Sequence, residues 1–282
     1  MKLGIVYEVI RWEERALIEA ARELGVELKL IHLHSVYMPI GSSDKDHVDI
    51  ALQRALSHAI ALNSTIALES ANIRVINNSL STAIAMNKLW TAQILVSRGI
   101  KVPRTIIAFE HEPSIKAVEA LGGYPVVIKP IDGSWGRLVS LARDHEELRS
   151  LLEHRSFIPN PIMRIFMIQE FIKKPGRDIR VFVIGEEAPV AIYRASEHWI
   201  TNTARGGVAL PAKVDSELEE IAIKTAKAIG GEFMGIDVFE DPERGYIVNE
   251  VNAVPEFKNT VRVTGYKVHV KVIEYIKQVA RK

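Results

Sequence analysis

The order of apolar and polar positions over the first 80 residues predicts an α/β unit. Apolar runs at Leu3–Tyr7 and Glu27–Leu33 are typical of buried strands, and the amphipathic stretch Trp12–Leu24 between them is typical of a helix. A strand, a helix and a strand in that order favour a parallel sheet. Further short strands are expected at Val48–Leu52 and Arg74–Ile76. No Gly-x-Gly-x-x-Gly follows the first strand, so the pattern does not support a dinucleotide site there.

The middle of the chain predicts a larger region that begins with a helix over Ser79–Arg98. Strand and helix patterns then alternate at Thr105–Phe109, Ile115–Leu121, Val126–Lys129, Leu138–Ala142 and Glu146–His154. A run of strands with few helical signals follows at Ile165–Ile172, Ile179–Ile184 and Pro189–Arg194. Consecutive strands without crossover helices favour an antiparallel sheet.

The last third of the chain predicts one helix and two strands. Ser216 and Glu219 have the spacing of a capping box at the start of a helix over Glu217–Ile229, which should end at Gly230. Two strands follow at Gly235–Glu240 and Tyr246–Val251. The fold class expected for the whole chain is therefore α/β with an α+β part.

Composition narrows the class of function. The 282 residues carry 36 basic and 35 acidic side chains and no cysteine. Zero cysteines exclude disulfide frameworks, Cys-ligated zinc, iron–sulfur clusters and a thiol nucleophile. The net charge of +1 gives no general electrostatic case for binding nucleic acid or an anionic membrane. Glu8 interrupts the first apolar run, and the uncharged stretch Ala55–Leu68 is too short and too polar to span a membrane, so we expect a cytoplasmic protein.

The most informative polar residues lie on the last two predicted strands. Asp237 falls within the first of them, and Glu250 and Asn252 fall at the end of the second. Adjacent antiparallel strands bring Asp237 near Glu250, and the period of two puts Glu250 and Asn252 on one face. Two carboxylates and an amide oxygen suit Mg²⁺, which keeps water and phosphate as its other ligands. A purely structural pairing of the two carboxylates is the alternative.

A glycine-rich loop, Gly133-Ser134-Trp135-Gly136-Arg137, follows the strand that ends at Lys129. Two glycines three residues apart allow the backbone to approach a polyphosphate and to point amide groups at it. Lys129, and Lys88 in the preceding helical pattern, could each face a phosphate. A plain tight turn and two solvated lysines are the alternatives.

Further polar groups follow in the sheet-rich region. Gln169-Glu170-Phe171-Ile172 suits a hinge whose backbone meets an adenine edge, and its alternative is an ordinary amphipathic strand. Arg177, Arg180 and Arg194 add guanidinium groups, and the loop Thr201–Gly207 could close over anions, although surface ion pairs would explain these residues as well. No His-Glu-x-x-His, Gly-x-Ser-x-Gly or EF-hand pattern is present.

Taken in order, these segments resemble the ATP-grasp superfamily and, within it, the RimK/LysX family. The most specific stretches are Pro175–Phe182, Thr201–Gly207 and Asn249–Asn259. The resemblance covers about residues 80–282, and the opening unit, 1–80, is similar to a pre-ATP-grasp domain. It implies an ATP-grasp domain over 81–282, in which two subdomains, roughly 81–168 and 169–282, clasp ATP.

The resemblance also implies roles position by position. ATP would be bound by Lys88, Lys129, Gly133, Ser134, Trp135, Gly136, Arg137, Gln169, Glu170, Phe171, Ile172, Asp178, Arg180 and Asn202. Magnesium would be held by Asp237, Glu250 and Asn252, and catalysis would use Arg180 and Arg194 to stabilise an oxyanion. The amino-acid substrate would meet Arg194, Glu256, Phe257, Lys258, Asn259 and Thr260.

The implied activity is that of an ATP-dependent carboxylate-amine ligase with ATP and Mg²⁺ as cofactors. The family members that these stretches resemble most join α-aminoadipate to the C-terminal Glu of the amino-group carrier protein LysW in lysine biosynthesis, through an acyl phosphate. Asn259-Thr260 resembles the aminoadipate-selecting pair, whereas glutamate-selecting relatives carry Gly-Phe. Ligation of glutamate to LysW, RimK-like addition of glutamate to another protein, and a non-catalytic nucleotide-binding module are the alternatives.

Two expectations concern partners. The resemblance implies a homo-oligomer. We also expect an acidic carrier protein to be attracted by a basic cluster in the sheet-rich half, made of Lys173, Lys174, Arg177 and Arg205.

Overall fold

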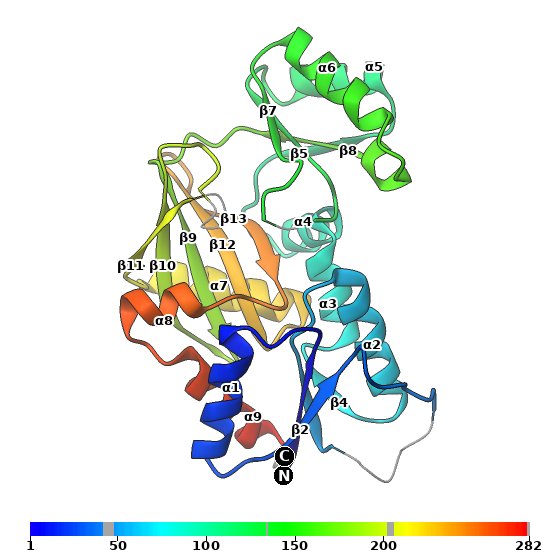
Figure 1. Ribbon diagram of the computed structural model, residues 1–282. Helices are drawn as coiled ribbons and strands as arrows, with labels where there is room; N and C mark the ends of the chain where they lie inside the picture. The colour runs from blue at the N-terminus through cyan, green and yellow to red at the C-terminus, as the bar shows by residue number, and fades with distance from the viewer. Residues whose placement is uncertain (42–47, 134, 202–205, 281–282) are drawn as a thin grey trace.

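Three β-sheets with helices on their outer faces make up the fold (Figure 1). The computed structural model describes residues 1–41, 48–133, 135–201 and 206–280. The sheets follow one another along the chain, and the second stands as a separate lobe above the other two in Figure 1. This mixed helix and sheet architecture agrees with the fold class expected from the sequence.

The first sheet is parallel, with the strand order β2 (Glu27–His32), β1 (Lys2–Tyr7), β3 (Ile50–Gln53) and β4 (Arg74–Ile76). Its connections include the helices α1 (Trp12–Glu23) and α2 (His58–Ser70). Leu3, Ile5 and Leu52 are fully buried because parallel strands covered on both faces take apolar residues at successive positions. The strand–helix–strand opening predicted from the sequence is thereby confirmed.

The second sheet is antiparallel, with the order β5 (Thr105–Ala108), β8 (Phe166–Glu170), β6 (Val126–Lys129) and β7 (Ser140–Ala142). The helices α5 (His111–Ala120) and α6 (His145–Ser156) pack on one face of it, around Leu148, Leu152 and Phe166. A short 3₁₀ helix, η1 (Pro161–Arg164), leads into β8.

The third sheet is also antiparallel, as the run of strands predicted. Its order is β11 (Val208–Ala212), β10 (Glu187–Ala195), β9 (Arg177–Ile184), β12 (Phe233–Asp241) and β13 (Gly245–Asn252). Helix α7 (Ser216–Ile229) packs against one face. Its N-cap is Asp215, whose carboxylate accepts from the Leu218 amide at 2.8 Å, so the predicted cap at Ser216 is wrong by one residue. Gly230 ends the helix at φ +77°, which only a residue without Cβ adopts freely.

The helix predicted over Ser79–Arg98 is two helices, α3 (Ser79–Met86) and α4 (Lys88–Ser97). Asn87 between them has an extended backbone, and its side-chain oxygen accepts from the Trp90 amide at 3.0 Å. Asn87 therefore ends one helix and caps the next, which a continuous apolar pattern conceals. The break puts Lys88 at the first position of α4, where its amide donates to the Ile131 carbonyl at 2.7 Å.

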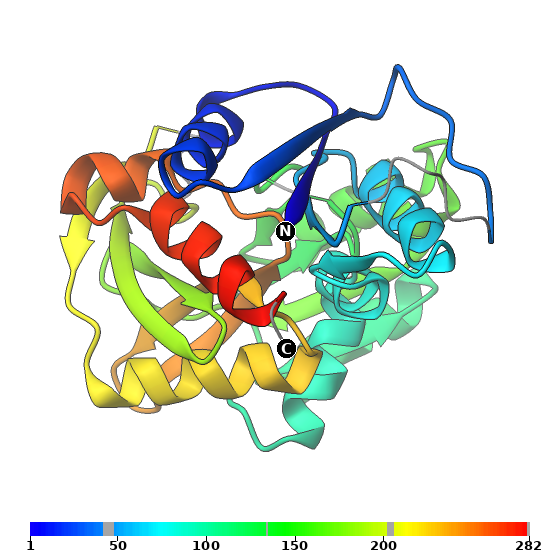
Figure 2. The ribbon, with the colours of Figure 1, turned by 90° about the horizontal axis from the view of Figure 1, so that it is seen from below.

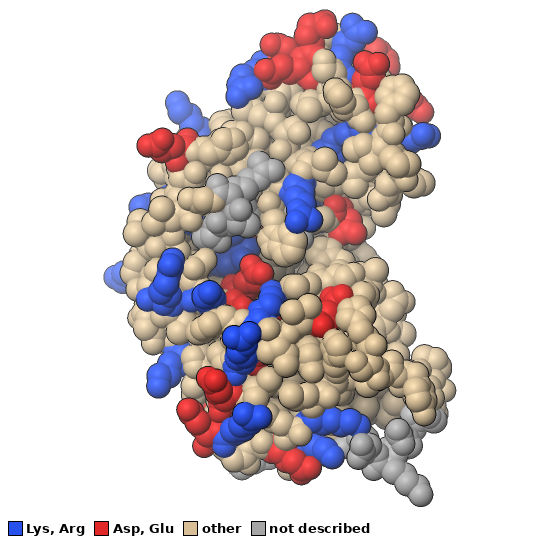
Figure 3. Space-filling model, viewed as in Figure 1, with Lys and Arg blue, Asp and Glu red and all other residues tan. Residues whose placement is uncertain are grey.

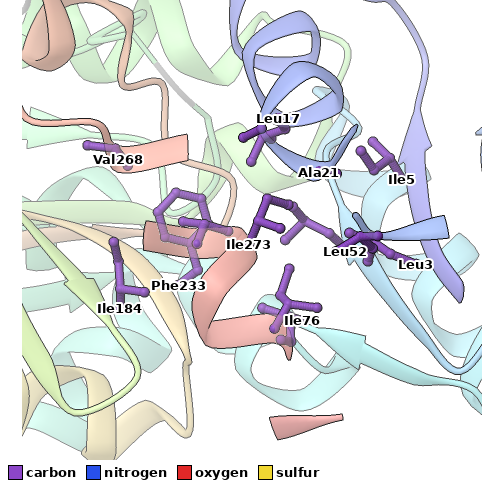
Figure 4. Close-up of a cluster of buried hydrophobic side chains, with 14 of the residues drawn as sticks. Leu3, Ile5, Leu17, Ala21, Leu52, Ile76, Ile184, Phe233, Val268 and Ile273 are labelled. Atoms are coloured by element: carbon purple, nitrogen blue, oxygen red, sulfur yellow. The ribbon is translucent and has the colours of Figure 1, made fainter. Parts of the chain in front are cut away.

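The chain returns to the first sheet at its C-terminal end. Helices α8 (Lys258–Thr264) and α9 (Val268–Val279), which the sequence patterns did not predict, follow the third sheet, and α9 packs against α1 (Figure 2). Figure 4 shows Leu3, Leu52 and Ile76 of the first sheet in one apolar cluster with Phe233 of β12 and Ile273 of α9. Residues beyond 252 thus complete the core of the N-terminal unit. Within the described residues, no helix has both the length and the apolar character needed to cross a membrane.

Candidate active site

A cleft of about 750 Å³, open solvent included, lies between the second and third sheets. Strands β6 and β8 line one side of it, and β9, β12 and β13 line the other. The lining residues are Lys88, Val127, Lys129, Pro130, Gly133, Gly136, Arg137, Val139, Gln169, Glu170, Phe171, Ile172, Lys174, Asp178, Trp199, Ile200, Thr201, Phe239, Asn249 and Glu250. In Figure 3 the surface is hollowed where the second-sheet lobe meets the rest of the molecule, with basic and acidic side chains close together.

Two lysines enter this cleft from different elements. The Lys88 ammonium from α4 lies 3.2 Å from Oε1 of Glu250, and the Lys129 ammonium at the end of β6 donates to Oδ1 of Asn249 at 3.2 Å. Burial is the main reason that the pKa of Lys129 falls to about 8; Glu250 opposes this shift and Lys88 adds to it. Neighbouring ammonium groups in a partly desolvated cleft form a site for an anion of high charge.

A β-bulge turns Asn249 and Glu250 toward the same cleft. Asp237 pairs with Glu250 across β12 and β13, but Val238 pairs with Val248, so Asn249 is an extra residue on β13. Strand alternation would send Asn249 and Glu250 to opposite faces, and the bulge removes that alternation locally. Both residues line the cleft in consequence. Sequence reasoning missed Asn249 because no residue pattern on β13 marks the bulge.

The glycine-rich loop stands at the edge of the cleft. Gly133, Gly136 and Arg137 line it, and the Arg137 guanidinium lies 4.7 Å from the centre of the Trp135 ring. Gly133 has φ +130° and Gly136 φ +64°, values that a glycine adopts without steric cost. Ser134 lies outside the described residues.

Arg155 of α6 holds the two ends of this loop together. Its Nη2 donates to the carbonyl oxygen of Ile128, before the loop, at 3.3 Å, and to that of Leu138, after the loop. The guanidinium is buried, and burial lowers its pKa to about 10. Both partners of this Nη2 are main-chain carbonyls, one on each side of the loop, so the side chain fixes the positions of the two segments that flank the loop.

The segment Gln169–Ile172 lines the cleft, but its polar side chains already bond to neighbouring residues. The Glu170 carboxylate accepts from the Arg104 side chain at 2.8 Å and from the Arg244 side chain at 2.7 Å, and Gln169 donates to a threonine hydroxyl on β5. Burial alone would raise the pKa of Glu170, and the bonds from both arginines hold it below its ordinary value. Phe171 contributes an aromatic ring, whose centre lies 6.2 Å from the centre of the Trp199 ring with an interplanar angle of 65°. What the segment offers a planar ligand is therefore backbone and apolar surface.

Lys174 is a cleft residue that sequence reasoning had placed elsewhere. Its ammonium is within 2.8 Å of the Thr201 hydroxyl and 3.5 Å of Asp178, and it lies 4.7 Å from the centre of the Phe239 ring. Burial lowers its pKa, mainly opposed by Asp178. Lys173-Lys174 in the sequence carries no signal that distinguishes the exposed lysine from the enclosed one.

Four charged side chains, from Arg194, Asp178, Arg180 and Asp237, form a row across the strands of the third sheet. Register pairs Arg194 with Asp178 across β10 and β9, and Arg180 with Asp237 across β9 and β12. Arg194 donates to both oxygens of Asp178 at 2.6 and 2.9 Å, and its Nη2 lies 2.9 Å from Asp237. Arg180 donates to both oxygens of Asp237 at 2.7 and 2.8 Å. The row links the cleft, which Asp178 lines, to the pockets that Arg180 and Arg194 line.

These contacts stabilise the charged forms of Asp237 and Arg194. Burial by itself would raise the pKa of Asp237, but Arg180 and Arg194 outweigh it and hold that pKa below its ordinary value. The pKa of Arg194 is raised because its two carboxylate partners overcome the cost of burial. Asp237 is thus a carboxylate, the form in which it can bind a cation.

The predicted metal ligands have the right chemistry for Mg²⁺. Asp237 lies directly opposite Glu250, and Asn252 lies two residues further along the same face. Asn252 donates its Nδ2 to the Gly235 carbonyl at 3.4 Å, which turns its nitrogen toward the strand and leaves its oxygen as an acceptor. Within the described part of the chain, no three His, Cys, Asp or Glu side chains gather as a metal site. The candidate set therefore depends on two carboxylates and one amide oxygen, a hard donor set that fits Mg²⁺.

A separate pocket of about 590 Å³ lies on the far side of the charged row. Its lining residues are Glu13, Arg180, Ile192, Arg194, Glu256, Lys258, Asn259 and Thr260. The Thr260 hydroxyl oxygen is buried and makes no hydrogen bond within the described structure. Phe257, predicted as a pocket residue, instead packs in the core, with its ring 6.1 Å from that of Phe233. Its large apolar side chain is fully buried there.

The N-terminal unit holds the segment that forms this pocket. Glu13 of α1 accepts from the Lys258 amide at 3.0 Å, Arg11 reaches Glu256 at 2.9 Å, and Arg54 donates to the Pro255 carbonyl at 3.1 Å. A charged residue such as Arg54 inside the apolar run ALQRAL was the available sequence signal, because a buried guanidinium needs partners.

Comparison with known families assigns both parts of the chain. The RimK-like ATP-grasp domain matches residues 85–276, and the LysX preATP-grasp domain matches residues 3–84. The chain belongs to the RimK-like ATP-grasp family. The family predicted from the sequence is thus confirmed.

Two relatives of this ATP-grasp protein carry different named activities. It is 46% identical to the alpha-aminoadipate–LysW ligase LysX of Sulfurisphaera tokodaii, over the full length of both chains. It is 37% identical to the glutamate–LysW ligase ArgX of the same organism, over 99% of both chains. Among solved structures, a RimK domain ATP-grasp protein from Sphaerobacter thermophilus superposes with a TM-score of 0.77 at 23% identity, covering 98% of this chain and all of the other. That last likeness shows the fold.

Most of the predicted site residues line three neighbouring pockets, of which the second shares lining residues with each of the other two. The predicted ATP residues that line the cleft between the second and third sheets are Lys88, Lys129, Gly133, Gly136, Arg137, Gln169, Glu170, Phe171, Ile172 and Asp178. Trp135 and Arg180 line a neighbouring pocket instead, and Asn202 lies outside the described residues.

Two members of the basic cluster expected to attract a carrier are engaged with neighbouring residues. Lys174 is turned into the cleft, and Arg177 is engaged with Glu240 at 2.7 Å and stacked 3.9 Å from the centre of the Tyr193 ring. Lys173 is exposed, and Arg205 lies outside the described residues. Neighbours in sequence on a strand or turn point in different directions, which a count of positive charges ignores.

Proposed function

We propose that this ATP-grasp ligase joins the α-amino group of α-aminoadipate to the side-chain carboxylate of the C-terminal Glu of the carrier protein LysW, as part of lysine biosynthesis. The observation that carries the proposal is the pocket beside Arg180 and Arg194, where Asn259 and Thr260 supply polar groups. Full-length identity of 46% to a LysX ligase, against 37% to an ArgX ligase, supports the choice of substrate.

The reaction proceeds in two balanced steps. A carboxylate oxygen of the carrier's Glu attacks the γ-phosphorus of ATP, the bond between that phosphorus and the β,γ-bridging oxygen breaks, and ADP leaves with the electron pair. The amine nitrogen of aminoadipate then attacks the acyl carbon of the acyl phosphate. The tetrahedral intermediate expels inorganic phosphate, and the nitrogen loses a proton.

The residues of the cleft provide the nucleotide site. Lys88 and Lys129 neutralise phosphate charge, and the backbone of the glycine-rich loop covers the phosphates and excludes water from the acyl phosphate. Phe171 and Ile172 offer apolar contact and backbone groups to the adenine. ATP-grasp ligases use ATP and Mg²⁺ in general, and the solved neighbour PsnB was complexed with Mg and ADP. Asp237, Glu250 and Asn252 would hold that ion here, where it supplies positive charge to the phosphates.

Arg180 and Arg194 serve the second step. Both side chains line the amino-acid pocket and the pocket that contains Glu250, which supports their assignment to a substrate carboxylate and the developing oxyanion. Lys258 adds a cation, and the unpartnered Thr260 hydroxyl adds a hydrogen-bonding group. An amino dicarboxylic acid fits this mixture of cationic and polar groups.

The test measures ADP release and adduct mass with purified LysW and a panel of amino dicarboxylic acids. We expect aminoadipate to give the highest kcat/KM and an adduct with the mass of carrier plus aminoadipate minus water. A preference for glutamate would assign the ArgX-type reaction, and ligation to a different protein would assign the RimK-type reaction. Nucleotide binding without ADP release under any of these conditions would leave only a nucleotide-binding module. The homo-oligomer stays a prediction, which light scattering of the purified protein tests.

A further inference from the structure

The second-sheet lobe is one continuous stretch of chain, from the start of β5 to the end of β8, so two peptide segments connect it to the rest of the molecule (Figure 1). These two segments are bonded to each other at the base of the lobe. The Glu170 amide donates to the Arg104 carbonyl at 3.0 Å, and the Glu170 carboxylate accepts from the Arg104 amide and from its Nε, both at 2.8 Å. The chain therefore enters and leaves the lobe at one place.

The third sheet reaches this place through Arg244, in the turn between β12 and β13. Its Nη1 donates to Oε1 of Glu170 at 2.7 Å, and its Nη2 donates to Oδ2 of Asp241 at 2.9 Å. The other oxygen of Asp241 accepts from the Arg244 amide at 2.9 Å. The guanidinium is thus held by its own hairpin on one side and bonds the base of the lobe on the other.

The backbone that enters the lobe is anchored on both sides of a two-residue segment. The Lys101 carbonyl accepts from the Val248 amide of β13 at 2.9 Å, which ties the chain to the third sheet. Arg104, three residues later, is already tied to the lobe by the bonds described above. Val102 and Pro103 lie between the two anchors, so a rotation of the lobe relative to the third sheet has to be absorbed there on the entering side. The Arg244 side chain spans this pivot.

We propose that Arg244 is a positioning residue of the nucleotide site, which sets the angle between the second-sheet lobe and the third sheet by holding Glu170. The proposal rests on the nucleotide part of the proposed function and is independent of the carrier and of the amino acid. Glu170 lines the cleft between these sheets, whereas Arg244 is not among its lining residues in the described part of the chain. Lys129 enters that cleft from the lobe and Glu250 from the third sheet. The angle of the lobe therefore sets the gap into which the phosphates fit.

The competing explanation is that Arg244 and Glu170 form an ordinary ion pair, which contributes to stability and to nothing else. Arg74 supplies a matched control, because it lies 2.7 Å from Glu232 and thereby joins the first sheet to the third. Its side chain is 47% exposed and that of Arg244 is 38% exposed, so the two pairs are screened by solvent to a similar degree. Arg74→Met therefore removes a comparable pair at a junction that does not include the pivot.

The first measurement is the affinity of the full-length protein for ADP with Mg²⁺, by isothermal titration calorimetry. We expect Arg244→Met to raise the Kd about fivefold, the size of effect that one partly exposed ion pair can transmit, and Arg74→Met to leave it unchanged. Arg244→Lys keeps the positive charge and should recover part of the affinity. Glu170→Gln should raise the Kd by more than Arg244→Met does, because the carboxylate also loses Arg104. Adding Arg244→Met to Glu170→Gln should change the Kd by less than about twofold, since the group through which Arg244 acts is then absent.

The second measurement reports the angle of the lobe directly. Because the chain has no cysteine, Glu153→Cys on α6 and Lys224→Cys on α7 place one spin label on the lobe and one behind the third sheet, both at exposed positions. Pulsed electron spin resonance without nucleotide should give the same distribution of label distances in the labelled protein with and without Arg74→Met. Adding Arg244→Met should broaden or shift that distribution, which the loss of an ordinary ion pair would not do.

Two results would overturn the proposal. One is an unchanged Kd for ADP in Arg244→Met, and the other is a raised Kd with an unchanged distance distribution, because the effect would then not pass through the angle of the lobe. If Arg244→Met fails to fold, as judged by circular dichroism, Arg244→Gln decides by the same two measurements. A wild type that binds ADP but shows no carrier-dependent ADP release would instead overturn the proposed ligation, and would leave the role of Arg244 to be decided by these binding data.

Discussion

Replacing Arg54 by methionine tests whether one buried cation of the N-terminal unit holds the segment that begins at Pro255 and lines the amino-acid pocket. Arg54 is almost fully buried at the end of β3, and it contacts Glu14 at 3.1 Å and the Pro255 carbonyl at 3.1 Å. Its guanidinium also lies 5.7 Å from the centre of the Phe257 ring, and its Nη2 finds no partner within the described structure. Burial lowers the pKa of Arg54, with Glu14 acting against that shift.

The expected loss in free energy of unfolding depends on the partners that Glu14 keeps after the substitution. Glu14 stays fully buried and retains Arg11, which donates at 2.8 Å, as its remaining partner. Removing one member of a buried ion pair costs about 3–5 kcal/mol, and the retained Arg11 contact places Arg54→Met near the lower end, about 3 kcal/mol. The lost bond to Pro255 should also loosen the segment that forms the amino-acid pocket, so the KM for aminoadipate should rise while the KM for ATP stays constant.

Urea unfolding, followed by tryptophan fluorescence and by far-UV circular dichroism, measures this loss. Coincident transitions by the two probes establish that one free energy of unfolding applies. In the double variant Arg54→Met with Glu14→Leu, no Glu14 carboxylate is left buried without Arg54. The double variant should therefore lose less free energy of unfolding than the sum of the single variants, with a coupling of about 2 kcal/mol. A loss below about 1 kcal/mol in Arg54→Met, or strictly additive effects, would refute the reasoning.

Three further outcomes are expected. Because the pKa of Lys129 is about 8, its ammonium is lost as pH rises through that value, so ATP affinity should fall above pH 8 in equilibrium titrations; Lys129→Arg should remove this dependence, and an equal slope in both proteins would contradict it. Arg155→Met should raise the KM for ATP by roughly tenfold because the loop stem loses its clamp, and a KM equal to that of wild type would exclude the clamping role. Glu250→Ala should abolish ATP-dependent ligation with an unchanged circular dichroism spectrum, and retained turnover at saturating Mg²⁺ would reject the metal assignment.

Local sequence patterns determined those helices and strands whose bounds depend on neighbouring residues. The strand Val126–Lys129 follows from the apolar run at residues 126–128, and the end of α7 follows from Gly230. The sequence did not reveal the break at Asn87, because a capping side chain inside an apolar pattern looks like any polar position on the helix surface. It also gave no sign that α9 packs against α1, since that contact joins residues more than 200 positions apart.

The sequence showed which types of residue could form the site, but the tertiary structure decided which of them contact one another. Asp237 and Glu250 could be paired in advance because adjacent antiparallel strands leave few registers. The bulge that turns Asn249 into the cleft and the direction of Lys174 depend on packing across the third sheet. Arg54 reaches Pro255 across 201 positions of sequence, and Phe257 turns inward because its apolar ring has a core to fill. Sequence specifies which groups are available and their local geometry; the burial of apolar surface between distant segments decides which of those groups meet.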